Sequence, residues 1–475
     1  MSERPPRGAP LIRALGLTDV ALMTVVAVVS LRWIARGARA GAPSIALWLL
    51  ACVAFFIPLA AALMELSSRD PSQGGIYTWT RKAFGPTHGF ICGWYVWVNN
   101  LFYFPSLLLF AASNALAIGG ARYQALNESA WYAIAFVLSG IWLTVFISIV
   151  GLRAGKWVQN LGTIGVWIPA GMLIGAGAVA LVKFGSATSF APSQLFPRFA
   201  GGADTLALWS AMCFAFSGLE VTSFVGQEVK DPRRAIPIGV LAAGAIIAFI
   251  YIAGSAAVLV AVAPGALDDR SGIADAVNLV GMRVAMPAAG PLVGAMLALG
   301  AFAGTLSWMG GSARVPFAAG IDRLLPEWLG RLHPKYRTPH LALLTQGVLS
   351  SLILLVSVFL TVTGARSSIQ DAYDVMVNLT ILAYFVPYVY LFLALPKLRR
   401  TSGRADGADV LHVPGGRLGL WSVTLLGCGA TLVSLALLFI PPPGTASVLN
   451  FEVNLAVQSA AVLGAGLLLY VRSRR

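Results

Sequence analysis

Long apolar runs, separated by short charged or Gly- and Pro-containing segments, make up most of the chain. The hydrocarbon core of a bilayer is about 30 Å thick, so a helix needs roughly 20 residues to cross it. Twelve runs have that length, near residues 14–38, 44–66, 87–118, 131–151, 157–182, 204–228, 236–263, 287–312, 340–362, 372–395, 418–440 and 452–471. The pattern predicts an all-α polytopic membrane protein with twelve transmembrane helices.

The composition agrees with this class. Of the 475 residues, 58% are apolar and 11% are charged, whereas ordinary globular chains are about half apolar and about a quarter charged. The missing charge argues against a soluble or disordered protein. The net charge of +14 does not indicate nucleic acid, because the basic residues recur as short groups between apolar runs, as in loops that face an anionic leaflet.

The basic residues also predict the orientation. With the amino terminus inside, the alternating loops place 24 of the 33 Lys and Arg residues on the inner side and 9 on the outer side. Cytoplasmic loops are rich in Lys and Arg, so we expect both termini in the cytoplasm of a protein of the plasma or inner membrane. No cleavable signal peptide is visible, because the first dozen residues are polar and Pro-rich.

The sequence shows no signature of enzymatic chemistry. All four cysteines lie inside apolar runs, where they are expected to act as small hydrophobes. The four histidines lack the spacing of a metal site, and no phosphate loop, nucleophile elbow or pair of intramembrane acids is visible. We therefore expect no enzymatic activity, no cofactor and no metal.

The clearest ionisable residue inside a predicted span is Glu220. It follows Ser217 and Gly218, a pair that weakens a helix. Charge at this depth is costly, and irregular backbone is tolerated there only beside protein or a water-filled cavity. We therefore expect Glu220 on a substrate or proton pathway. The alternative is a carboxylate that is hydrogen-bonded to a neighbouring helix for structure only.

Three arginines recur at helical spacing in the first predicted span. Arg32, Arg36 and Arg39 are spaced i, i+4 and i+7, which predicts one basic stripe on its outer half. Snorkelling to lipid phosphates accounts for Arg39 and is plausible for Arg36. Arg32 lies about 26 Å into the span at 1.5 Å per residue. Two interpretations stay open for it: contact with the substrate route or an acid there, or an extended reach to the outer interface.

The third predicted span places polar side chains just before a proline. Asn99, Asn100 and Tyr103 precede Pro105. Buried Asn and Tyr side chains need hydrogen-bond partners. Bonds between helices would satisfy that need, and the alternative is that these residues line a cavity. Trp308, in the run 287–312, is by its type a packing or lipid-belt aromatic.

Longer blocks of the sequence resemble the amino acid-polyamine-organocation (APC) permeases. These blocks are Glu65–Trp79 with Phe84-Gly85-Pro86 and Gly89-Phe90, the sixth-span pattern ending in Glu220 with Pro232-Arg233 and Pro237, and the later Asp322, Leu325-Pro326 and Thr338-Pro339. They are spread across most of the chain, which makes the resemblance stronger than that of one short motif.

The resemblance implies a LeuT-like transporter with twelve spans, a five-plus-five inverted repeat, and helices 1 and 6 broken around the substrate. It implies a first repeat over residues 1–183, a second over 204–395, and the last two spans with the tail over 396–475. The family's break in span 1, commonly Gly-x-Gly, falls here near Ala27-Val28-Val29-Ser30. The lysine that some proton-coupled members carry in span 5 is absent.

The resemblance also implies roles for single residues. By position, Phe214 is similar to the aromatic gate of the arginine/agmatine exchanger of this superfamily, and Glu220 is similar to its proton-sensing acid. Trp308 stands 14 residues before Asp322, as the eighth-span gate tryptophan does in that exchanger. Substrate contacts are expected at Val29, Ser30, Arg32, Asn100, Tyr103, Phe216, Ser217, Gly218 and Leu219.

We therefore expect a secondary active transporter for amino acids, with proton-coupled symport or exchange by alternating access. Its expected partners are a small amino acid or amine, protons and membrane lipid, and not nucleic acid; no oligomeric state is predicted. Arg32 favours a substrate with an anionic side chain or a second carboxylate, because it would repel a cation. A polyamine or organic-cation permease of the same fold and a non-transporting amino acid sensor are the alternatives.

Overall fold

The computed structural model describes residues 16–70, 75–150, 152–197, 203–220, 229–313, 326–362, 369–401, 410–441 and 448–473. These residues form a bundle of helices, and no β-strand occurs among them. Several residues of the expected motifs lie outside these ranges: the end of the sixth run, 221–228, as well as Asp322 and Leu325.

The longer helices are α1 (Leu17–Val28), α2 (Arg32–Ala38), α3 (Pro43–Ala51), α4 (Ile57–Arg69), α5 (Gly75–Phe84), α6 (Pro86–Leu116), α7 (Ala130–Val150), α8 (Leu152–Phe184), α9 (Ala203–Ala215), α11 (Pro232–Ala261), α12 (Gly272–Arg283), α13 (Ala289–Ser312), α15 (His340–Val362), α16 (Ile369–Thr401), α17 (Gly416–Leu437) and α18 (Val448–Ser473). A π-helical turn, η1 (Cys52–Phe56), joins α3 to α4. Short 3-10 turns are η2 (Ala117–Gly119), η3 (Ala121–Glu128), η4 (Pro192–Gln194), η6 (Pro264–Ala266) and η7 (Glu327–Gly330).

Most of the predicted spans appear as continuous helical segments. Within the described residues, nine segments are long and apolar enough to cross a membrane: Pro43–Arg69, Pro86–Gly119, Ala130–Val150, Ile164–Phe184, Arg234–Ala261, Ala289–Ser312, His340–Phe359, Ile369–Thr401 and Gly416–Leu437. Each coincides with one predicted run. The first run is interrupted between α1 and α2, and α9 ends at Ala215 inside the sixth run. The last predicted run lies within α18, which is not among the nine.

Prolines and one glycine set several helix boundaries. Pro43, Pro86 and Pro232 occupy the first turns of α3, α6 and α11, where a missing N–H has no consequence. Gly85 separates α5 from α6 with a φ of 93°, a value that favours glycine. Pro105 lies inside α6 and removes one helical hydrogen bond there. The irregularity falls next to the polar residues of that helix.

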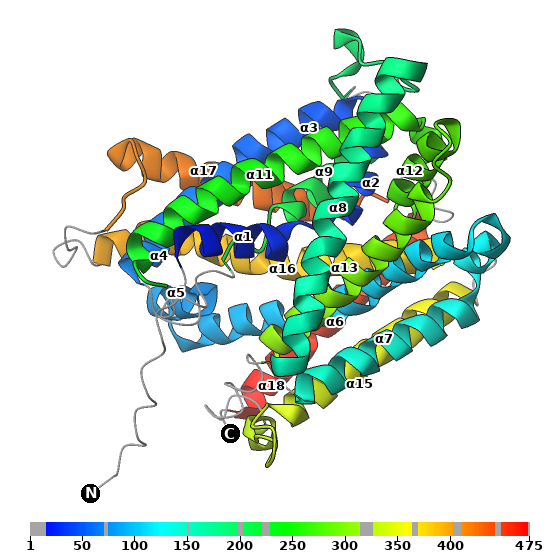
Figure 1. Ribbon diagram of the computed structural model, residues 1–475. Coiled ribbons are helices and arrows are strands. Elements are labelled where there is room, and N and C mark those ends of the chain that lie inside the picture. Colours follow the sequence, from blue (N-terminus) through cyan, green and yellow to red (C-terminus); the bar gives the residue numbers. More distant parts are fainter. Residues whose placement is uncertain are drawn as a thin grey trace, which may run out of the picture.

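Among the nine segments long enough to cross a membrane, those of α6 and α16 are the most enclosed. The most apolar windows of these two helices are 78% and 72% buried, against 33% for α7 and α17. Helix α6 packs against α13 and α16, and α1 packs against α11. Figure 1 shows α7 and α15 side by side along one edge of the bundle, with α3 and α11 together at another. Functional side chains on α6 and α16 are therefore shielded by the surrounding helices.

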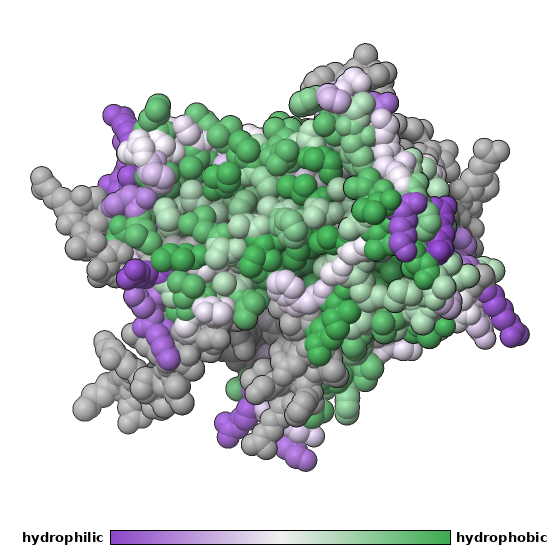
Figure 2. Space-filling view, turned by 45° about the horizontal axis from the view of Figure 1, so that its top comes forward, coloured by the Kyte–Doolittle hydropathy of each residue, from purple (hydrophilic) through white to green (hydrophobic). Residues whose placement is uncertain are grey.

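The surface between the polar ends is apolar. Figure 2 shows a broad hydrophobic area across the middle of one face, with hydrophilic residues gathered toward two opposite ends. Large exposed hydrophobic side chains include Trp131, Phe146, Val182, Phe249 and Phe359. An apolar surface of this extent is unfavourable in water and favourable in lipid. This surface is the one expected of a multi-pass membrane protein.

Candidate functional site

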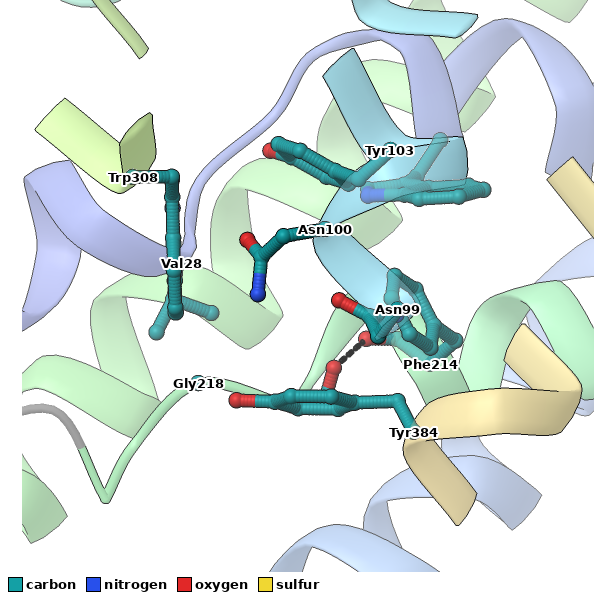
Figure 3. A pocket seen from close by; sticks show the side chains of 10 residues that line it. Val28, Asn99, Asn100, Tyr103, Phe214, Gly218, Trp308 and Tyr384 are labelled. Carbon is teal, nitrogen blue, oxygen red and sulfur yellow. Dashed lines mark hydrogen bonds between the residues drawn. The ribbon is translucent and has the colours of Figure 1, made fainter. Parts of the chain in front are cut away.

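A small cavity lies where the break between α1 and α2 and the segment after α9 meet α6, α13 and α16. It has a volume of about 30 Å³ and is lined by Val28, Trp33, Asn99, Asn100, Tyr103, Phe214, Ser217, Gly218, Trp308 and Tyr384. In Figure 3, Trp308, Tyr103, Phe214 and Tyr384 surround the space, and the amide of Asn100 points into it. This volume holds about two water molecules.

One tyrosine links the two helix breaks. Tyr251 of α11 is fully buried, and its hydroxyl oxygen lies 3.1 Å from the carbonyl oxygens of both Val28 and Ala215. The same hydroxyl accepts the backbone N–H of Ser30 at 3.3 Å. The end of α1 and the end of α9 are thus held by one side chain. This arrangement satisfies backbone groups that a break in a buried helix leaves without helical partners.

The backbone after α9 is specialised at Gly218. Its φ is 97°, which favours glycine, and its N–H donates to the hydroxyl of Tyr388 at 3.0 Å. A Cβ at this position would lie 3.6 Å from the indole of Trp308, so the backbone passes close beneath that ring. The hydroxyl of Ser217 donates to the carbonyl of Phe214 at 2.5 Å. The turn is therefore tied to α16 and packed under Trp308.

Glu220 lies behind the cavity wall, where two tyrosine hydroxyls donate hydrogen bonds to it. It is 1% exposed. The hydroxyls of Tyr384 and Tyr388, one turn apart on α16, both donate to its carboxylate, Tyr388 at 2.9 Å. Tyr384 also lines the cavity. One side chain therefore connects the cavity to the buried acid.

Aromatic rings form most of the cavity wall. Phe214 packs edge-on against Trp33 and Tyr384, with ring centroids 5.2 and 5.7 Å apart. Tyr103 lies 6.2 Å from Trp308 by the same measure. Aromatic pairs at these distances are favourable. The five aromatic residues come from five helices, α2, α6, α9, α13 and α16, so relative motion of these helices would change the size of the cavity.

Two amides provide the polar part of the wall. Asn99 donates to the carbonyl of Thr380 at 2.7 Å and so ties α6 to α16. Asn100 donates to the carbonyl of Val96 in its own helix at 2.8 Å. Both side chains also line the cavity. The two alternatives for these residues therefore occur together: Asn99 joins two helices and borders the cavity.

Arg32 is the first residue of α2 and has no exposed surface. It donates from Nη1 to the hydroxyl of Ser106 at 3.1 Å. Its guanidinium carbon lies 4.2 Å from the ring centre of Trp33 and 4.8 Å from that of Tyr103. Both rings line the cavity. Trp33 and Tyr103 therefore contact both the guanidinium and the cavity.

A second group of charges surrounds Arg36, one turn further along α2. Arg36 donates to Asp269 at 3.0 Å, to Asp374 at 2.5 Å and to Asn378 at 3.2 Å, and Arg39 also reaches Asp269 at 3.1 Å. We call these five residues the arginine–aspartate cluster. It ties α2 to α16 and to the loop between α11 and α12. Burial raises the pKa of the Asp269 carboxyl above its ordinary value, although Arg39 and Arg36 act in the opposite direction.

The arginine stripe does not extend to lipid. Arg32 and Arg36 are 0% and 3% exposed, so snorkelling does not describe either of them. Arg36 is paired inside the bundle instead. The physical reason is that α2 is enclosed by α9, α11 and α12, and Arg36 finds its acceptors inside the bundle, on α16 and in the loop before α12.

The structure gathers part of the predicted site around the cavity. Asn100, Tyr103, Phe214, Ser217, Gly218 and Trp308 line it. Val29, Ser30, Arg32, Phe216, Leu219 and Glu220 lie beside it without lining it. Phe216 packs on Trp48, Phe56 and Tyr251 on the side of α3 and α11.

Sequence reasoning missed four aromatic residues: Trp33, Tyr251, Tyr384 and Tyr388. Tyr384 and Tyr388 are four residues apart in a predicted span, which places two phenols on one face of a helix. That spacing was a usable signal for a polar site. Trp33 and Tyr251 are single aromatics in apolar runs, and nothing in their spacing distinguishes them from packing residues.

Comparison with known proteins finds a matching family and several related transporters. A family profile described as amino acid permease matches residues 15–465. The chain is 28% identical to an uncharacterized transporter of Legionella pneumophila over 90% of each chain. It is 24% identical to the Probable agmatine/putrescine antiporter AguD of Lactococcus lactis, over 74% of this chain and 72% of that one. It is 27% identical to the serine/threonine exchanger SteT of Bacillus subtilis, over 76% and 75%.

A solved structure shares the fold. The crystal structure of MhsT in complex with L-phenylalanine superimposes with a TM-score of 0.61 at 16% identity, covering 91% of this chain and 100% of that one. The expectation of a LeuT-like helical fold is thereby confirmed. The count of twelve spans and the inverted repeat stay predictions.

Proposed function

The chain belongs to the amino acid permease family, and from that premise we propose that it moves amino acids by alternating access, coupled to protons through Glu220. It is a multi-pass membrane transporter. The observation that carries the finer proposal is the position of the cavity, at the meeting point of two interrupted helices and one phenol away from a buried acid. Transporters of broken-helix design bind substrate at such points.

The size of the cavity supports a gating role for its aromatic wall. A volume of about 30 Å³ is far too small for an amino acid, which occupies the space of several water molecules. Substrate entry therefore requires the rings of Phe214, Trp308, Tyr103 or Tyr384 to move. Phe214 and Trp308 are the gates in this proposal, and the backbone around Val28, Ser217 and Gly218 contacts the substrate.

The arginine–aspartate cluster supports closure on one side. With both termini in the cytoplasm, as the basic loops predict, the cluster lies toward the outer side of the bundle. Its ion pairs join α2, α16 and the loop carrying Asp269. Opening this side requires buried ion pairs to separate, which costs free energy unless water reaches them as they part. In this proposal the cluster holds the outer side of the bundle closed, and we call this role an outer latch.

Glu220 is the proton-coupling group in this proposal. Its carboxylate accepts two phenolic hydrogen bonds from α16 and lies in the segment whose backbone reaches the cavity. Protonation removes the charge that holds these phenols, so it changes the contact between the break after α9 and helix α16. Movement of these elements relative to one another would then follow the protonation state.

The decisive experiment is uptake into proteoliposomes at a series of external pH values. Glu220→Gln mimics the protonated acid, so we expect uptake to lose its pH dependence while exchange of substrate continues. Glu128→Gln is the matched control, because Glu128 pairs with Arg270 away from the cavity and the variant should keep the wild-type pH profile. An unchanged pH profile in well-folded Glu220→Gln would overturn the proton role.

A further inference from the structure

Among the described residues, no acid forms an ion pair with the buried cation Arg32. The three most buried arginines in the described part of the chain are Arg32, Arg270 and Arg36, at 0%, 2% and 3% exposure. Arg270 pairs with Glu128 and Asp268, and Arg36 pairs with two aspartates. Arg32 forms no ion pair with any described residue, which sets it apart from the other two.

Arg32 also has hydrogen-bond donors that have no acceptor among the described residues. Its Nε and Nη2 are buried and have no hydrogen-bond partner among the described residues, while Nη1 is bonded to Ser106. Two guanidinium nitrogens therefore remain for a ligand that accepts hydrogen bonds.

Structural needs alone do not account for this arrangement. A buried charge without a counter-charge is strongly destabilising, and cation–π contact with Trp33 and Tyr103 offsets only part of that cost. A methionine or leucine would pack there at lower free energy. The guanidinium presents parallel N–H groups that match the two oxygens of a carboxylate.

The position relative to the cavity indicates where that carboxylate comes from. Trp33 and Tyr103 contact the guanidinium on one side and line the cavity on the other. Since the cavity must enlarge to admit a substrate, the same ring movements that open it expose Nε and Nη2. A substrate in the cavity then lies one side chain away from Arg32.

We propose that Arg32 binds a carboxylate of the transported substrate, so that the carrier selects carboxylate-bearing amino acids, dicarboxylic ones above all, and rejects diamines. The inference rests on the transport function proposed above and deepens it. A diamine in the same position would add a second positive charge beside an uncompensated guanidinium, which is strongly unfavourable in a buried site.

The test compares substrates that differ only in their charged groups. Counterflow of labelled L-glutamate, L-glutamine, γ-aminobutyrate and putrescine is measured in proteoliposomes with wild-type protein, Arg32→Gln, Arg32→Lys and Arg283→Gln. Binding of the same four compounds is measured separately, as thermal stabilisation of the purified proteins. Arg283→Gln is the control, because it removes one positive charge at the exposed end of α12, outside the cavity lining and outside the arginine–aspartate cluster.

Wild-type protein should favour glutamate and exclude putrescine. In Arg32→Gln, glutamate affinity should fall by about 30-fold or more, as expected for loss of one partner of a buried charge pair. Arg32→Lys keeps the charge but not the planar fork, so it should retain the preference for glutamate at reduced affinity. Arg283→Gln should leave the ranking of the four compounds unchanged.

The pattern of losses identifies which carboxylate is bound. If only glutamate and γ-aminobutyrate weaken in Arg32→Gln, the distal carboxylate binds Arg32; if glutamate and glutamine weaken equally, it is the α-carboxylate. Putrescine as the best wild-type substrate, or undiminished glutamate handling in Arg32→Gln, overturns the inference. A third outcome separates the two proposals. If glutamate stabilises wild-type protein but not Arg32→Gln, and no compound shows counterflow, the inference about Arg32 is upheld and the proposed transport function is refuted.

Discussion

Arg32 and Arg36 are one turn apart on α2 and almost equally withdrawn from solvent, but their surroundings are opposite. Arg36 is held by two aspartates and an asparagine, from α16 and from the loop before α12. Arg32 has one serine hydroxyl and two aromatic rings. Arg36 lies in a closed group of charges. Arg32 lies beside a cavity, and its Nε and Nη2 have no hydrogen-bond partner among the described residues.

The difference shows how one helix stripe serves two purposes. In the arginine–aspartate cluster two arginines face two aspartates, so the charges balance and the contacts join separate parts of the bundle. At Arg32 the charge is not balanced within the described residues, and an anion that arrives with the substrate would balance it. The first arrangement stabilises a closed conformation, and the second makes a bound carboxylate favourable.

The largest expected effect is that of Arg36→Met. Removing Arg36 leaves Asp374 without its ion pair and Asp269 with Arg39 alone, and loss of one partner from a buried pair destabilises by about 3–5 kcal/mol. Denaturant unfolding in detergent micelles should show a fall of that size. A loss below about 1 kcal/mol would mean that water satisfies the aspartates and that the cluster is not a structural latch.

Arg32→Met should not destabilise the protein, in contrast to Arg36→Met. The substitution removes a buried charge that lacks a counter-charge, so the free energy of unfolding should stay constant or rise by up to about 1–3 kcal/mol. The same micelle experiment measures it, alongside substrate binding, which should be lost. Destabilisation as great as that of Arg36→Met would show that Arg32 is structurally paired, and the contrast between the two arginines would disappear.

The smallest expected effect is that of Ser106→Ala. This change removes the hydroxyl that accepts from Arg32, and a hydrogen bond to a charged group contributes about 1.5–3 kcal/mol at most. We expect the loss of unfolding free energy to lie near the lower end of this range, because the guanidinium keeps its contacts with Trp33 and Tyr103. In an Arg32→Met background the loss should vanish, and a double-mutant cycle in unfolding free energy checks this coupling.

Much of the site was visible in the sequence as a set of anomalies. Glu220 and Arg32 stood out because charge is rare within spans, and Asn100 and Tyr103 because they precede Pro105. Phe214 and Trp308 were selected by the family resemblance, and both line the cavity. The bounds of most spans were also predictable, because apolar length alone decides them.

The partners of these residues were not predictable. Glu220 meets Tyr384 and Tyr388, which are 164 and 168 residues away, and Tyr251 closes two helix breaks from a third helix. Periodicity indicates which face of a helix is buried. It does not indicate which other helix lies against that face, since many helices in a membrane bundle have similar apolar surfaces.

The sequence by itself determined that the chain crosses a membrane and which ionisable residues enter it, because the length and composition of each run decide its transfer from water to lipid. Only the tertiary structure decided which of those charges is paired. Arg36 finds Asp269 and Asp374 at separations of 233 and 338 residues, while Arg32, four positions earlier, finds no acid among the described residues. Pairing depends on distances of a few ångströms between side chains that are far apart in sequence, so folding sets these distances and local sequence does not.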